Sequence, residues 1–81
     1  MTRDDITARV RTVLADTFGA DPATISDATT AADIPGWDSL SHLILIAGIE
    51  QACGFPLPLE PSLSAPNIGS LIDLIDQSQP A

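Results

Sequence analysis

The sequence predicts a small all-α fold, with three main helices plus a short, proline-disrupted third helix or turn. Apolar residues recur at helical spacing in three separate stretches, and no strand pattern or repeat is apparent. Four prolines between residues 55 and 66 exclude a long helix there. With 81 residues, the chain is expected to form a single domain over residues 1–81.

The first helix is expected over about residues 3–18. Its apolar positions follow a helical spacing: Ile6, Val10, Val13, Leu14 and Phe18. Asp4 and Asp5 suit the first turn of a helix, and Gly19 is a typical stop. A long connection follows, which we expect Ile25 and Ile34 to pin to the core.

The second helix is expected over about residues 39–52, with Asp38 as its N-cap and Gly54 as its stop. It is apolar on nearly every side, so it must be wholly buried or must meet a partner. We expect one stripe to face the core, namely Leu43, Ile46 and Ile49. Leu40, Ile44 and Ala47 would then lie nearer a partner face.

Residues 59–64 can form a single turn, with Pro61 in its first turn. The last helix is expected over about residues 67–76, with Asn67 as its N-cap. One apolar stripe marks its inner face: Ile68, Leu71, Ile72 and Ile75.

The chain is strongly acidic, with three basic residues, eleven acidic residues and a net charge of −8. All three arginines lie within the first eleven positions, which argues against nucleic acid or an anionic membrane as a partner. There is no signal-peptide pattern and no stretch long enough to span a membrane. The single cysteine, Cys53, excludes a cysteine-based zinc site and favours a reducing, cytoplasmic compartment. No metal site is expected.

The segment Gly36-Trp37-Asp38-Ser39-Leu40 places a serine hydroxyl where a turn becomes a helix. The free N–H groups and positive dipole end of a helix favour a phosphate there. Together with residues 33–43, the pair Ile49-Glu50, Gly54 and the segment 67–71, this motif resembles the acyl carrier protein family. The resemblance covers nearly the whole chain.

This resemblance implies an acyl-carrier-like bundle that carries 4′-phosphopantetheine on Ser39. A phosphopantetheinyl transferase would attach the arm, whose thiol holds acyl intermediates as thioesters. An acyl-loading ligase or acyltransferase and downstream acyl-processing enzymes would be the partners. The expected function is that of a free-standing, monomeric carrier in a specialised biosynthetic pathway, and not of an enzyme.

Seven residues are candidates for partner recognition around the arm: Trp37, Asp38, Leu40, His42, Ile44, Ala47 and Glu50. Trp37 is expected mainly to pack the loop, and His42 to lie on nearly the same helix face as Ser39. Cys53 stands where the family usually has phenylalanine, and Phe55 is expected to supply that volume. Because the second helix offers few carboxylates, recognition is expected to be more apolar than electrostatic.

Two other functions remain open at the level of sequence. An aminoacyl or peptidyl carrier protein shares the fold and the arm, although Trp37-Asp38 disfavours it. An unmodified helical interaction module would keep the fold without the arm. An enzyme is the least supported reading, because no pair of titratable groups is set for acid–base work.

Overall fold

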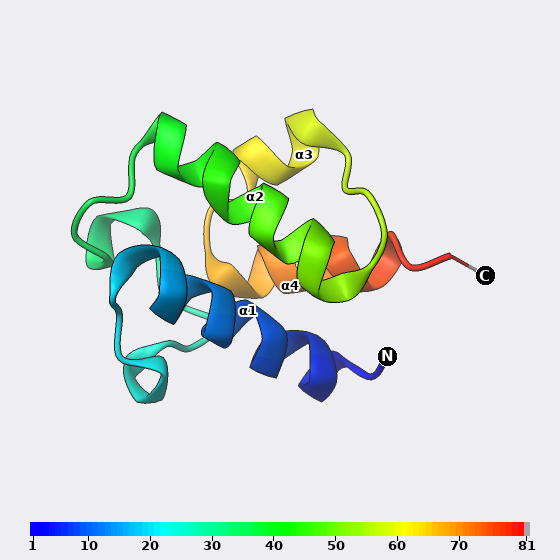
Figure 1. The fold of residues 1–81 in the computed structure, drawn as a ribbon, viewed down its shortest axis with the longest axis horizontal. Helices are drawn as coiled ribbons and strands as arrows, with labels where there is room; N and C mark the ends of the chain where they lie inside the picture. Colours follow the sequence, from blue (N-terminus) through cyan, green and yellow to red (C-terminus); the bar gives the residue numbers. More distant parts are fainter. Residues whose placement is uncertain (81) are drawn as a thin grey trace.

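The computed structural model describes residues 1–80 and contains four α-helices (Figure 1). They are α1 (Arg3–Phe18), α2 (Ser39–Cys53), α3 (Leu59–Ser64) and α4 (Ile68–Gln77). Two short 3₁₀ turns, Pro22–Thr24 and Ala31–Asp33, interrupt the connection between α1 and α2. No strand occurs within residues 1–80, so the predicted all-α fold class is confirmed.

The sequence determines both ends of α1 through local chemistry. The Thr2 hydroxyl accepts the Asp5 N–H, and the Asp5 carboxylate accepts the Thr2 N–H, each at 3.2 Å. This capping box satisfies two backbone donors that a helix start otherwise leaves unpaired. Gly19 ends the helix with φ at 68°, a left-handed conformation that glycine adopts without strain.

The inner face of α2 differs from the one expected. Leu45, Ile46 and Ile49 are buried, whereas Leu43 is 45% exposed, so the prediction that Leu43 faces the core is wrong. The close approach of α1 fixes the rotation of α2, because a Cβ added to Gly48 would lie 2.9 Å from Val13 Cγ1. Leu45 and Ile49 are one turn apart and therefore share the buried face.

The long connection between α1 and α2 is held to the core and to α4. Ile25 and Ile34 are buried, as predicted. The Ile68 N–H donates to the Thr29 carbonyl (2.9 Å), and the Gly69 N–H donates to the Asp27 carbonyl (2.8 Å). The connection therefore caps the first turn of α4 with its own backbone.

Helix α3 contacts α2 and α4, and Figure 1 shows it across α2 from α1. It is six residues long and begins after Pro58, whose side chain has no polar atom to cap it. Ser62 is fully buried, and its hydroxyl donates to the Leu59 carbonyl at 2.7 Å. The sequence predicted a turn or a short helix over residues 59–64, and the structure contains a short helix there.

The core lies between α1, α2 and α4, and the α1–α2 connection and the segment before α3 also contribute buried residues to it. It comprises Ile6, Val10, Leu14, Ile25, Ile34, Leu45, Ile46, Ile49, Leu57, Ile68, Leu71, Ile72 and Ile75. This core positions the start of α2 at the surface, where the candidate site lies.

Candidate functional site

Ser39 is the first residue of α2 and is exposed. Asp38 precedes it as the N-cap, as predicted, and its Oδ1 accepts the Ser41 N–H at 2.8 Å. This bond to the backbone N–H of Ser41 holds the pKa of the Asp38 carboxyl below its usual value. The Ser41 hydroxyl donates to the Gly36 carbonyl at 3.0 Å, which fastens the preceding turn to the helix.

These residues fit a phosphodiester on the Ser39 oxygen. The hydroxyl is exposed at the positive end of the α2 dipole, where a phosphate is stabilised. Gly36, at φ 86°, makes the turn that brings the chain to this point. The start of α4 differs, because loop carbonyls already accept its first N–H groups. The start of α2 is the better place for the phosphate.

His42 connects the loop, α2 and α3 through both of its ring nitrogens. The Trp37 Nε1–H donates to His42 Nδ1 (3.0 Å), and His42 Nε2 lies 2.8 Å from the Ser62 carbonyl oxygen. Because the indole N–H can only donate and a carbonyl oxygen can only accept, these two contacts fit an imidazole that accepts at Nδ1 and donates from Nε2. The Trp37 ring also packs on Phe18, with centroids 5.4 Å apart. Trp37 therefore packs the loop, as expected, and His42 has an internal role that the sequence did not reveal.

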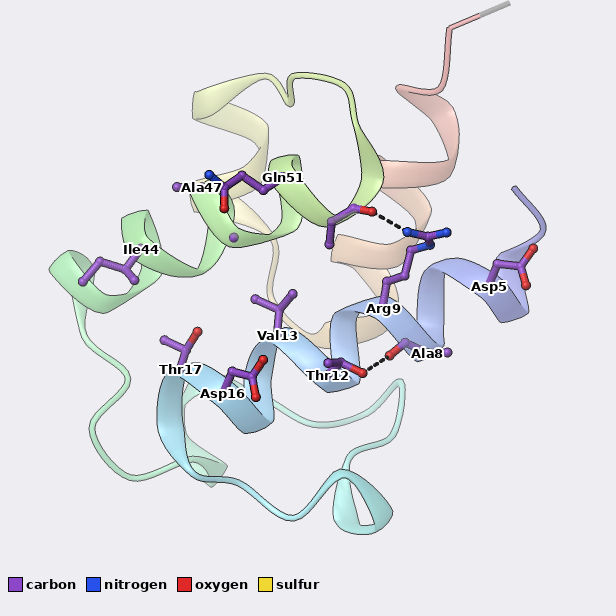
Figure 2. Close-up of a pocket in the computed structure, with 12 residues that line it drawn as sticks. Asp5, Ala8, Arg9, Thr12, Val13, Asp16, Thr17, Ile44, Ala47 and Gln51 are labelled. Carbon is purple, nitrogen blue, oxygen red and sulfur yellow. Dashed lines mark hydrogen bonds between the residues drawn. The ribbon is translucent and has the colours of Figure 1, made fainter.

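A cleft of about 480 Å³ lies beside Ser39. It is lined by Ala31, Trp37, Asp38, Ser39, His42, Leu43 and Leu63. A larger cavity of about 940 Å³ lies between α1 and α2 (Figure 2), and Arg9 reaches from α1 to the Ala52 carbonyl there. Its α2 lining is Ile44, Ala47, Gly48, Gln51 and Ala52, a different face of the helix from Ser39. Because the smaller cleft lies beside Ser39 and the larger cavity does not, the smaller cleft is the candidate functional site.

The remaining recognition candidates divide into two groups. Leu40 and Ile44 are 68% and 55% exposed, and Ala47 is also exposed, so these three lie on the outer surface. Glu50 is half-buried, and its Oε2 accepts the Leu57 N–H at 2.8 Å. Glu50 thereby holds the segment that leads from α2 into α3.

Cys53 is half-buried and packs against the core together with Phe55. Burial raises the pKa of its thiol, and the nearby charge of Arg9 opposes this only in part. Cys53 therefore behaves as a small packing residue.

Within residues 1–80, no three His, Cys, Asp or Glu side chains gather as a metal ion would require. None of the helices described for this chain is both long and apolar enough to cross a membrane.

Comparison with known proteins identifies the family. A family model described as "Phosphopantetheine attachment site" matches residues 8–75, a span that includes Ser39 and its cleft. The chain is 28% identical over 75 residues to the acyl carrier protein of Sinorhizobium fredii. The aligned region covers 93% of this chain and 96% of the relative. The chain matches the acyl carrier protein AcpP of Rhizobium meliloti with the same identity and coverage. The chain belongs to the acyl carrier protein family, whose members carry acyl groups on phosphopantetheine.

Proposed function

We propose that Ser39 carries the 4′-phosphopantetheine arm and that the protein delivers acyl thioesters within a specialised biosynthetic pathway. One observation carries the assignment: Ser39 is an exposed hydroxyl at the first residue of α2, inside the span that matches the phosphopantetheine family. The attached arm supplies the thiol that forms the thioester.

The protein's own residues position the modified oxygen. Asp38 fixes the start of α2 through the Ser41 N–H, and the helix dipole faces the site of the phosphate. In the attachment step the Ser39 Oγ–P bond forms and the pyrophosphate bond of coenzyme A breaks. Adenosine 3′,5′-bisphosphate leaves, and the hydroxyl proton passes to the transferase or to water.

An apolar surface beside Ser39 supports docking of the partner enzymes. Leaving aside Met1, the exposed large apolar side chains of residues 1–80 all belong to the start of α2 and to α3. They are Leu40, Leu43, Ile44, Leu59 and Leu63, which we call the α2–α3 apolar surface. Because exposed large apolar side chains favour protein contacts, the transferase and the acyl-loading and acyl-processing enzymes are proposed to dock on these two helices. The specialised pathway is supported by the 28% identity to the named carriers and by this apolar surface.

The assignment is tested by intact-protein mass after incubation with a broad-specificity phosphopantetheinyl transferase, coenzyme A and magnesium. The native chain and a Ser64→Ala control, which loses an exposed serine at the end of α3, should each gain one arm. Ser39→Ala should gain none. If the folded native chain gains no mass, or if Ser39→Ala still gains it, the assignment of Ser39 is wrong.

The docking surface is tested by the kinetics of the same modification. Leu40→Ser and Ile44→Ser should raise the transferase KM severalfold while leaving the fold intact, because both side chains are exposed. Gln77→Ser, at an exposed position at the end of α4, serves as the matched control. A KM that rises steeply with salt in the native chain would instead indicate electrostatic docking.

A further inference from the structure

Two cavities meet at a shared wall beside the candidate site. The outer one is the 480 Å³ cleft at Ser39. The inner one is about 100 Å³ and reaches Leu71, a core residue that is 1% exposed. Four residues line both cavities and therefore stand between them: Ala31, Trp37, His42 and Leu63.

Hydrogen bonds hold this wall closed. The chain of contacts from Trp37 Nε1 to His42 Nδ1 (3.0 Å) and from His42 Nε2 to the Ser62 carbonyl (2.8 Å) ties the loop and α3 to α2. We call it the Trp37–His42–Ser62 bridge. Opening it would leave a buried carbonyl and a half-buried indole N–H without partners, which opposes opening.

An acyl group on an arm at Ser39 meets the outer cleft first. Leu43 and Leu63 at its mouth are 45% and 46% exposed, so the cleft gives an alkyl chain only partial shelter from water. Burial as deep as Leu71 requires crossing the wall in which Trp37 and His42 stand.

Building on the proposed function, we propose that His42 is a positioning residue whose bridge keeps the inner cavity closed. Short acyl groups are then the cargo that the closed cleft suits. A long chain stays exposed on the native protein, since reaching Leu71 would break both hydrogen bonds of the imidazole.

The test uses protein carrying acetyl, hexanoyl or decanoyl arms, made with the transferase and the matching acyl-coenzyme A. Mass spectrometry first establishes that each arm is attached. The measurements are then the rate of thioester cleavage by hydroxylamine and the methyl NMR shifts of Leu71. The native chain is compared with His42→Ala, with Trp37→Phe, which loses the indole donor together with part of the ring, and with Gln51→Ala as the control on another face of α2 from His42.

On the native chain and on Gln51→Ala, the three thioesters should be cleaved at rates within about twofold of one another. On His42→Ala, the decanoyl thioester should be cleaved at least about fivefold more slowly than acetyl, and decanoyl alone should shift the Leu71 methyls. Trp37→Phe should show a smaller protection of the same kind, which keeps the test decisive if circular dichroism shows that His42→Ala does not fold. If decanoyl is protected on the native chain as strongly as on His42→Ala, the proposal of a closed wall is wrong. It is also wrong if neither bridge variant shows a dependence on chain length. In both cases the proposed function still stands. Absence of any arm on the native chain overturns both the closed wall and the proposed function.

Discussion

Helices α2 and α4 are built from similar apolar residues, but they use them differently. In α4 the apolar residues form one stripe that is buried, and Asp73 and Asp76 lie on the exposed side. In α2 about as many large apolar residues are exposed as are buried, with Leu40 and Ile44 facing water. The pattern of α4 is that of a helix shaped by folding alone. Folding alone does not explain the exposed apolar residues of α2, whereas the proposed docking of partner enzymes does.

The test with the largest expected effect replaces one isoleucine in each helix by alanine. Ile72→Ala, in the fully buried stripe of α4, should lower the free energy of unfolding by about 2–5 kcal/mol because it leaves a cavity in the core. Ile44→Ala, at an exposed position of α2, should change it by less than about 0.5 kcal/mol. Urea unfolding measures both, and an equal loss in the two variants would remove the distinction between the helices.

The glycines of the two helices should differ in the same direction. Gly69→Ala in α4 should cost about 1–3 kcal/mol of unfolding free energy, because its Cβ would lie 3.1 Å from the Asp27 carbonyl oxygen and 2.9 Å from Asp27 Cβ. Gly48→Ala should cost less, since its contact is with the Val13 side chain and alanine adds about 1 kcal/mol of helix propensity. Thermal unfolding distinguishes them, and the reverse order would contradict the tight seating of α4 on the loop.

The cap of α4 gives a smaller effect. Asn67 Oδ1 accepts the Ser70 N–H at 2.8 Å, as the sequence led us to expect of this N-cap. Asn67→Ala should cost about 1 kcal/mol of unfolding free energy, and Asn67→Asp should restore most of it. A loss in Asn67→Asp as large as in Asn67→Ala would show that the residue acts through packing.

The Asp38 cap of α2 should make the free energy of unfolding depend on pH, and we expect this to be the smallest of the effects. The pKa of Asp38 is lower in the folded protein than in an unfolded chain, so ionised Asp38 stabilises the fold above the usual aspartate pKa. That stability is lost as the pH falls through the lower, folded-state pKa. Asp38→Asn keeps an acceptor for the Ser41 N–H but does not titrate. The stability difference between the native chain and this variant, followed by urea unfolding, should shrink toward acid pH; a constant difference would contradict the origin of the shift.

Much of this fold could be predicted from the sequence because its signals are local. The three main helices, the Asp38 and Asn67 caps, and the buried Ile25 and Ile34 all follow from spacing and residue type. The rotation of α2 could not be predicted, since a helix that is apolar on nearly every side has no periodicity to indicate its inner face. It depends instead on the contact of Gly48 with Val13.

The candidate site divides in the same way. The sequence identifies Ser39 and Asp38 through the turn-to-helix motif, but it does not reveal the partners of His42. The acceptor on α3 is the backbone carbonyl of Ser62, twenty positions away, and a carbonyl is present at every residue whatever its side chain. Only the three-dimensional path of the chain shows the bridge and the two cavities that it separates.

The backbone bonds between the long connection and α4 have a consequence for cooperativity. The N–H groups of Ile68 and Gly69 are held by carbonyls of the connection, so the first turn of α4 cannot open without releasing that segment. Hydrogen exchange at these two amides should therefore report one shared opening event, with a common free energy. We therefore expect the connection to belong to the same cooperative unit as α4.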